Sequence, residues 1–400
     1  MSLIVTKKAR IGAAFIFCSV LLLQITLSFH STRRAADRAQ ASPPRSCSGA
    51  LSHLWETIIR NYLPTNHSTR TNATAVAGVC VERFQAEMQA RGGVHHDTSA
   101  IGIRIASNTI QLPPDIDFDE HLHGWLQGML RLLERSLTNC PLPKNHPDLV
   151  FVLSTSDWPL VSKTAFPQAI PVLGTTTTPA HWDIPVPGSV LWTWKSHAPS
   201  RTWRSRQDVA FFRGSATCAS YDDMLQCPRV LAWMHAQQHP CDVDVGITNR
   251  VDVAAMAGRA PARAAPIAEH ESYRYLLSFD GNSYARRFAE IMGLGSTVLK
   301  AVSVHGYEEF FYPLLQEWVH FVPFECTPQS CDIAAVVREL REHADSAEAI
   351  AHNMQAFKER YLSPTSLDTY WHVLLLRLLR VRAEQPWASA WDSVIAPAAP

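Results

Sequence analysis

The stretch from Tyr273 to Phe311 constrains the fold more than any other part of this 400-residue chain. Its first seven residues, Tyr273–Phe279, are apolar and aromatic enough for a buried strand. The polar turn Asp280–Ser283 supplies capping side chains, so a helix is predicted to begin near Tyr284. Ser296–Lys300 is then predicted to be the next strand. A strand, a turn, a helix and a strand in this order form the repeating unit of α/β proteins.

Two adjacent arginines, Arg286 and Arg287, stand in the predicted first turn of this helix. The helix dipole disfavours a cation there by roughly 0.3–1 kcal/mol, and an anion bound at the same helix end would reverse that cost. Arg286 has Glu290 one turn on as a solvated partner. Arg287 shares its face with apolar residues, so it is predicted to point inward and to mark a diphosphate site. The structural alternative is that Arg287 pairs with a carboxylate such as Asp280.

Short apolar runs alternate with helical segments along the rest of the chain, which predicts parallel, layered α/β sheets. A boundary near residues 196–206 divides an N-terminal Rossmann-like domain, 51–200, from a C-terminal one, 201–385, whose last helices can cross back onto the first. Further strands are predicted at Leu149–Leu153, Ile170–Leu173, Val190–Trp194, Val209–Phe212 and Val243–Ile247. Helices are predicted at Leu51–Leu63, Val76–Ala90, Leu122–Leu137, Asp222–Gln238, Ile333–His343, Ala347–Tyr361 and Leu367–Arg382.

Polar residues follow two of these predicted strands, and open α/β sheets bind ligands beyond the carboxyl ends of their strands. Asp157 follows the first, where an aspartate can act as a general base. Its alternative role is a helix N-cap, with Pro159 in the first turn. After the second strand, Arg213 can hold a phosphate, Gly214 permits close backbone approach and Ser215 offers a hydroxyl. The alternative for that triplet is an ordinary strand-to-loop turn.

The N-terminal segment Ile11–Phe29 contains nineteen residues without a charge. At about 1.5 Å per residue it nearly spans a bilayer core of about 30 Å. The alternative is a cleaved signal peptide, but the apolar part of such peptides is usually about 7–15 residues long. We therefore expect an uncleaved type II anchor, with residues 1–10 as a cytoplasmic tail and 30–50 as a stem, while residues 386–400 form a C-terminal tail.

Two sequons, at Asn66 and Asn72, and eight cysteines beyond the apolar segment indicate a glycosylated, disulfide-containing lumenal domain. Hydrophobic residues make up 46% of the chain and charged residues 18%, which is typical of a globular protein. The formal net charge is zero, which argues against a nucleic-acid partner.

Several ordered motifs resemble the capsule-associated-protein family of glycosyltransferases, which includes protein O-glucosyl- and O-xylosyltransferases and fungal xylosyltransferases. The resemblance covers roughly residues 148–380. This chain departs from the family pattern at Arg286, where a small residue is usual, and at Ser283, where a glycine is usual. The motifs are Ser154–Pro159, Phe211–Ser215, Tyr273–Leu276, Asp280–Asn282 with Arg287, Gly295–Lys300, Glu309–Pro313 and Trp318–Pro323.

The resemblance implies a GT-B fold, in which two Rossmann-like domains face a cleft. It implies an inverting enzyme of the Golgi or endoplasmic reticulum that moves xylose or glucose from a UDP-sugar to a hydroxyl of a protein or glycan. Asp157 on the acceptor side would be the base, and Arg287 would stabilise the departing diphosphate. The other donor-binding residues would be Arg213, Gly214, Ser215, Asp280, Gly281 and Asn282. The family is generally metal-independent, so no cofactor is expected.

Two alternatives lead to different experiments. One is a lumenal carbohydrate-binding or scaffolding protein that keeps the fold without turnover. The other is a retaining, metal-dependent transferase in which Asp242 and Asp244 hold Mg²⁺ or Mn²⁺. The Asp-x-Asp pattern also occurs twice within 115–119, and a period-two pair can equally be the solvated face of a strand.

Overall fold

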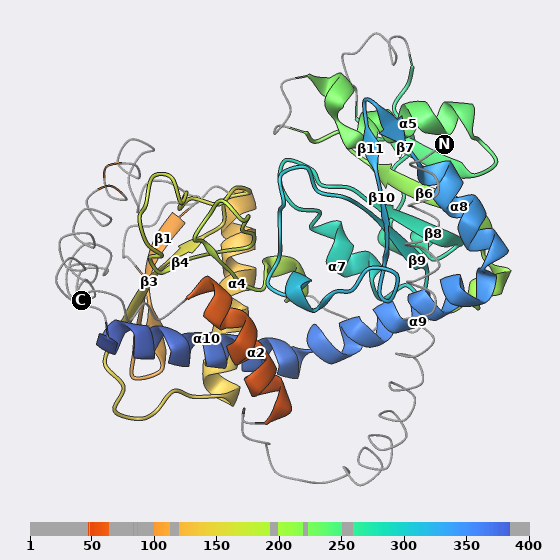
Figure 1. The fold of residues 1–400 in the computed structure, drawn as a ribbon. Coiled ribbons are helices and arrows are strands. Elements are labelled where there is room, and N and C mark those ends of the chain that lie inside the picture. Colours follow the sequence, from red (N-terminus) through yellow and green to blue (C-terminus); the bar gives the residue numbers. More distant parts are fainter. Residues whose placement is uncertain are drawn as a thin grey trace, which may run out of the picture.

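The computed structural model describes residues 47, 49–63, 83, 86, 100–112, 120–192, 199–218, 223–249 and 259–384. These residues form two halves, each built on one β-sheet, and long C-terminal helices run beneath both (Figure 1). The predicted anchor at 11–29, the sequons at Asn66 and Asn72 and nearly all of the helix predicted at 76–90 lie outside them. None of the helices in the described part of the chain has the length and apolar character needed to cross a bilayer.

The sheet of the second half is parallel throughout, and its strand order is β10-β9-β8-β6-β7. The order along the sheet reverses between β6 and β8, and such a switch point is where α/β sheets of this kind bind ligands. The four strands predicted in this half are confirmed as β6 to β9, and β10 is a strand that the sequence did not predict. The strands of this sheet are β6 (Gln207–Gly214), β7 (Val243–Ile247), β8 (Tyr273–Ser278), β9 (Thr297–Ala301) and β10 (Val322–Phe324). A small hairpin, β11 (Cys326–Thr327) and β12 (Ser330–Cys331), follows.

The sheet of the first half is mixed, with the order β2-β1-β3-β4-β5, so the prediction of parallel sheets is wrong for one part of it. Only β3, β4 and β5 run parallel, and β1 is antiparallel to both neighbours. Ser107 and Asn108 both have positive φ, which folds β1 directly back onto β2 as a tight hairpin. The strands are β1 (Ala100–Ala106), β2 (Thr109–Gln111), β3 (Leu149–Ser154), β4 (Val172–Gly174) and β5 (Ile184–Pro185).

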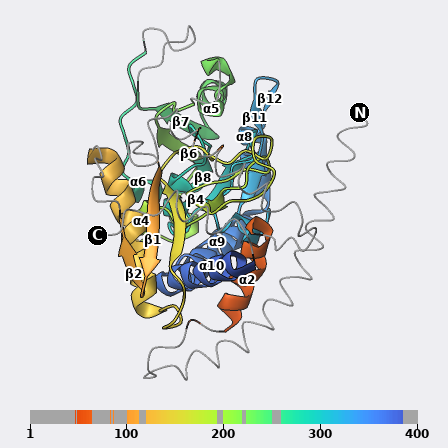
Figure 2. The ribbon, with the colours of Figure 1, turned by 90° about the vertical axis from the view of Figure 1, so that its left-hand side faces the viewer.

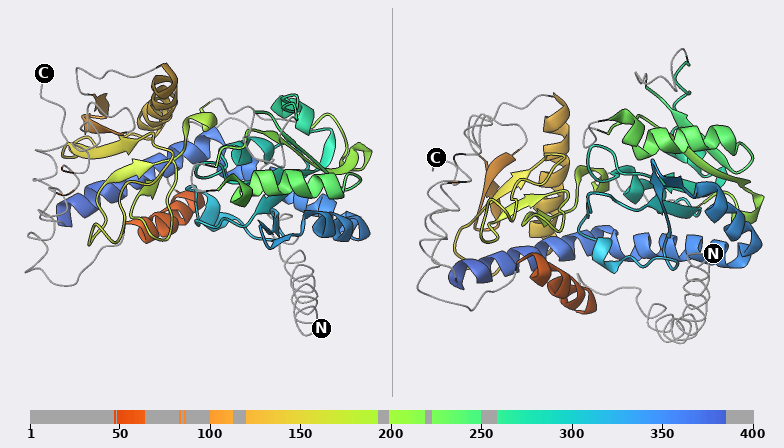
Figure 3. Two further views of the ribbon diagram at one scale, coloured as in Figure 1. Left: turned by 90° about the horizontal axis from the view of Figure 1, so that it is seen from above. Right: turned by 45° about the horizontal axis from the view of Figure 1, so that its top comes forward.

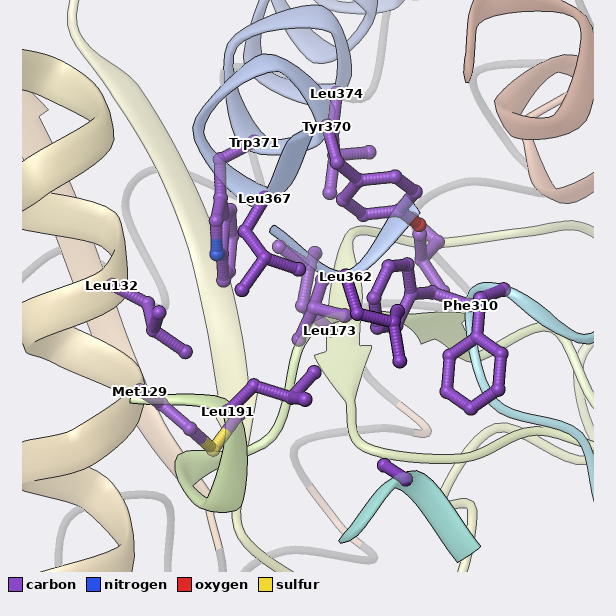
Figure 4. Close-up of a cluster of buried hydrophobic side chains, with 14 of the residues drawn as sticks. Met129, Leu132, Leu173, Leu191, Phe310, Leu362, Leu367, Tyr370, Trp371 and Leu374 are labelled. Atoms are coloured by element: carbon purple, nitrogen blue, oxygen red, sulfur yellow. The ribbon is translucent and has the colours of Figure 1, made fainter. Parts of the chain in front are cut away.

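The strand predicted at 190–194 is also wrong, because Ser189–Leu191 forms a 3-10 helix, η1. It packs against helix α4 (Glu120–Asn139), where a Cβ on Gly128 would lie 2.6 Å from the Ser189 Cβ. Leu191 lies beside Met129 in the buried cluster (Figure 4). The apolar residues of this segment are therefore buried by packing against α4, and not by pairing as a strand of the sheet.

Helices α9 and α10 form a nearly continuous rod that passes from the second half to the first (Figure 3). Helix α10 lies beside α2 and against α4 (Figure 2). In α10, the Tyr370 hydroxyl donates to the Pro185 carbonyl at 2.5 Å, and Asp368 accepts from Arg135 Nε at 2.7 Å. The C-terminal helices thus cross back and join the two halves. The helices are α2 (Ala50–Tyr62), α5 (Pro228–Gln238), α6 (Ile267–His270), α7 (Arg287–Ile291), α8 (Ile333–Glu342), α9 (Ala344–Tyr361) and α10 (Pro364–Glu384), with 3-10 turns η2 (Trp203–Ser205), η3 (Met224–Gln226) and η5 (Tyr312–Leu314).

Three disulfides lie in the described residues: Cys47–Cys140, Cys218–Cys227 and Cys326–Cys331. The first ties the segment before α2 to the end of α4, and the second closes the loop before α5. Cys241 is an exposed free thiol, and Cys80 lies outside the described residues. The predicted disulfide-containing domain is therefore confirmed for six of the eight cysteines.

Trp55 of α2 is fully buried where the rod meets both halves. Its ring centroid lies 5.1 Å from that of Tyr370 and 5.8 Å from that of Phe310. We expect Trp55→Ala to lower the free energy of unfolding by roughly 3–5 kcal/mol, because a large cavity would remain. Denaturant titration measures this change. The matched control is Trp158→Ala, a 43% exposed tryptophan, which should cost about 1 kcal/mol or less. Equal losses would contradict the packing described.

Candidate active site

A cavity of about 280 Å³ lies between the two halves, at the carboxyl ends of β6 and β8. Its position is the topological switch point, and its volume is close to the lower end of ligand pockets, roughly 300 Å³. Both halves contribute residues to its wall, so the site is complete only when the halves are together. The first half supplies Trp125, Met129, Thr155, Asp157, Thr175 and Ser189. The second supplies Phe212, Thr217, Arg229, 277–279, 281–287, Glu290 and Ile291.

Asp157 lies half-buried at this wall, in the turn that follows β3. Asn282 Nδ2, from the other half, donates to Asp157 Oδ2 at 3.4 Å, and Trp158 Nε1 donates to the Asn282 carbonyl at 3.1 Å. The Ser156 hydroxyl accepts from the Trp158 amide at 3.1 Å and shapes the turn. No helix occurs between Asp157 and Ser189, so the alternative of a helix N-cap is wrong. The carboxylate instead faces the cavity.

Arg287 lines the same cavity as this carboxylate and belongs to the second half. Its guanidinium donates to the Arg213 carbonyl oxygen and lies 5.5 Å from the centroid of the Phe212 ring. Burial lowers its pKa, Glu290 opposes that shift, and Arg286 adds to it. The inward orientation predicted for Arg287 is confirmed, and its hydrogen bond goes to a carbonyl rather than to the Asp280 carboxylate. However, α7 is only five residues long and begins at Arg287, so a helix dipole contributes little here.

Arg229 of α5 is a residue of the cavity wall that the sequence did not predict. Its partly buried guanidinium donates to the carbonyls of Asp280 at 3.0 Å, Ser215 at 2.8 Å and Phe279 at 3.1 Å, and to the Thr217 hydroxyl at 2.7 Å. Burial is the main cause that lowers its pKa to about 10, with the charge of Arg287 adding to the shift and that of Asp280 opposing it. Arg229 therefore holds the loops after β6 and β8 together beside the cavity. A lone arginine in an apolar helix was the only signal.

Gly214 and Gly281, two of the residues predicted to bind the donor, lie where an arginine side chain comes too close to the backbone for a Cβ atom. A Cβ on Gly214 would lie 2.8 Å from the Phe212 ring and 3.0 Å from Arg287 Nη1. A Cβ on Gly281 would lie 2.9 Å from Arg229 Nη2. The sequence suggested that Gly214 admits a phosphate, whereas here it makes room for a guanidinium.

Four of the residues predicted to contact the donor are absent from the described cavity wall: Arg213, Gly214, Ser215 and Asp280. Phe212 faces the cavity, so Arg213, the next residue of the same strand, points to the opposite face of the sheet. There its Nη2 lies 2.8 Å from Asp244 Oδ1. The Asp280 carboxyl is buried, which raises its pKa, although Lys300 opposes that shift. Among the predicted residues, Asp157, Gly281, Asn282 and Arg287 do line the cavity.

The aspartates of the metal-dependent alternative have arginine partners. Asp242 pairs with Arg341, and Asp244 pairs with Arg213. Within the ranges that the structure describes, no three His, Cys, Asp or Glu side chains are placed to hold a metal ion. The second Asp-x-Asp region, at 115–119, lies outside those ranges.

Comparison with known proteins gives one family. The family profile described as Glycosyl transferase family 90 matches residues 135–390. The O-glucosyltransferase rumi homolog of Anopheles gambiae is 27% identical over 270 residues, which are 61% of this chain and 65% of that protein. Protein O-glucosyltransferase 1 of Homo sapiens is 26% identical over 254 residues, 57% of this chain and 62% of that protein. The chain thus spans less than two thirds of the length of these relatives.

Among solved structures, Anabaena Alr3699/HepE in complex with UDP aligns with a TM-score of 0.26 and 13% sequence identity. The alignment covers 42% of this chain and 47% of that one. The relatives named as O-glucosyltransferases agree with the predicted resemblance to protein O-glucosyltransferases. The resemblance to capsule-associated proteins stays a prediction.

Proposed function

This chain belongs to glycosyl transferase family 90, and from that premise we propose that it transfers a sugar from a UDP-sugar to a hydroxyl group of a protein or glycan. The observation that carries the proposal is the cavity between the halves, which brings a half-buried carboxylate and arginine side chains together. Two sheets facing this cavity fit the GT-B arrangement. The names of the relatives favour a protein acceptor and glucose as the donor sugar, with xylose as the alternative.

The proposed reaction is a direct displacement. Asp157 accepts the proton of the acceptor hydroxyl, and the acceptor oxygen attacks the anomeric carbon of the sugar. The bond from that carbon to the β-phosphate oxygen breaks, and its electron pair leaves with UDP. Arg287 opposes the negative charge that grows on the diphosphate. The displacement inverts the anomeric carbon, because attack and departure occur on opposite faces.

Arg287 is suited to this role because its positive charge is not neutralised by an ion pair within the described residues. Arg286 and Arg229 lie near it, and the charge of each of them repels that of Arg287. Binding of an anionic diphosphate would relieve that repulsion. Arg213, Ser215 and Asp280 would act indirectly, through the Arg287 and Arg229 positions that their backbone carbonyls fix.

The proposed location is the lumen of the Golgi or endoplasmic reticulum, with the N-terminal segment 11–29 as a type II membrane anchor. Three disulfides in the described residues support an oxidising compartment.

The experiment that tests the proposal measures UDP release by the purified chain from UDP-glucose and UDP-xylose, with acceptor proteins present. We expect release from one of these donors to persist in excess EDTA, because arginines rather than a cation would neutralise the diphosphate. Loss of release in EDTA, restored by Mn²⁺, would instead support the metal-dependent alternative with Asp242 and Asp244. UDP binding without release from either donor would support the non-catalytic binding protein.

A further inference from the structure

The two adjacent arginines of the cavity wall project in different directions. Arg287 turns inward to the Arg213 carbonyl, whereas the exposed side chain of Arg286 lies over the ring of Trp125, with its Cζ 5.0 Å from the centroid. Arg286 belongs to the second half and Trp125 to α4 of the first, and both line the cavity. The stacked pair therefore spans the cavity from one half to the other.

Among the three arginines that line the cavity, Arg286 has the most N–H groups without a hydrogen-bond acceptor in the described residues. A guanidinium has five N–H groups, and Arg229 directs its own at three carbonyls and a hydroxyl. Arg286 makes no hydrogen bond or ion pair to any residue that the structure describes, so the partnership with Glu290 that its spacing predicts is not formed. Its charge is instead held on an aromatic face, which leaves the N–H groups at the guanidinium edge open to a ligand.

The charge of the cavity wall favours an anion for those groups. Three arginines line the cavity, against two carboxylates, Asp157 and Glu290. A planar guanidinium fork matches the paired oxygens of a phosphate group. Stacking on Trp125 limits the rotamers of a long, exposed side chain, so less conformational entropy is lost when the ligand binds.

We propose that Arg286 binds the diphosphate of the donor as a second arginine beside Arg287, and that Trp125 is the positioning residue that holds it there. The inference rests on the proposed function, since the diphosphate belongs to the donor proposed above. It adds that the first half takes part in donor binding through an aromatic ring, although the remaining diphosphate contacts come from the second half.

The test is equilibrium titration of the full chain with UDP, inorganic pyrophosphate and uridine. We expect Arg286→Ala to weaken binding of UDP and pyrophosphate by roughly 10- to 100-fold, the usual effect of removing a charge-assisted hydrogen bond. Uridine, which has no phosphate, should bind as it does to the wild type. Trp125→Leu should weaken UDP binding less, and Trp125→Phe should restore it, because Phe keeps an aromatic face. The double variant of Arg286→Ala and Trp125→Leu should be no weaker than Arg286→Ala alone.

The control is Arg204→Ala, which removes an exposed arginine that pairs with Glu348 on the surface and should not change binding. Wild-type affinity of Arg286→Ala for UDP would overturn the inference and leave the proposed function intact. An equal loss for UDP and uridine would also overturn it, because the effect would then be structural. A wild-type chain that binds neither UDP nor pyrophosphate in this titration would overturn the proposed donor and this inference together.

Discussion

Replacing Asp157 with asparagine is expected to lower the transfer rate by about 10²- to 10⁴-fold, which is the range that a positioned general base contributes. Asparagine keeps the shape of the side chain and can still contact Asn282, but it cannot accept the acceptor proton. Because the carboxylate lies at the cavity wall and accepts its hydrogen bond from Asn282 of the other half rather than from an arginine, UDP binding should be close to that of the wild type.

The measurement is single-turnover transfer with saturating donor and acceptor, alongside UDP titration. The matched control is Asp345→Asn, which changes a 94% exposed aspartate on α9 and should leave turnover unchanged. Turnover of Asp157→Asn within a few-fold of the wild type would show that another group removes the proton. A loss of UDP binding equal to the loss of turnover would place Asp157 in donor binding instead.

Replacing Arg287 with alanine is expected to lower kcat by about 10²- to 10³-fold, as removal of a preorganised donor to a developing anion typically does. The reason is that its charge lies partly buried beside Phe212, in surroundings that strengthen its interaction with a phosphate. Arg287→Lys keeps the charge but loses the planar fork, so it should recover only part of the rate.

A structural contribution of Arg287 must be separated from the catalytic one, since the side chain also hydrogen-bonds the Arg213 carbonyl. Thermal unfolding of Arg287→Ala measures the first, and kcat at a temperature well below the transition measures the second. Arg204→Ala serves as the control for loss of an arginine from the same half. A folded Arg287→Ala chain with nearly wild-type kcat would contradict the proposed role.

Some site residues could be predicted because local patterns reveal where a strand ends. Asp157 follows an apolar strand and a polar turn, and Arg287 shares a face with apolar residues, so both were placed at the cavity from sequence. The prediction for Arg213 was wrong because it placed all residues at the end of β6 on the same side of the sheet. Side chains alternate along a strand, and once Phe212 faces the cavity, Arg213 faces Asp244 on the other side.

Other residues could not be predicted because their roles depend on contacts between segments far apart in the chain. Arg229 is about fifty residues before the carbonyls of Phe279 and Asp280 that it binds, and nothing near it in sequence marks them. Trp125 meets Arg286 only because α4 of the first half faces the second half across the cavity.

The sequence by itself determined four strands of the second sheet, β6 to β9, the polar turns at their carboxyl ends and the family, since hydrophobic periodicity, capping residues and motif spacing are local properties. Only the tertiary structure decided that the first sheet is mixed, which helices α10 packs against, and which arginines reach the cavity. The physical reason is that the direction of a side chain depends on strand register and on the surface packed against it. Strand register and packing surfaces are set only when segments that are distant in the sequence are buried together.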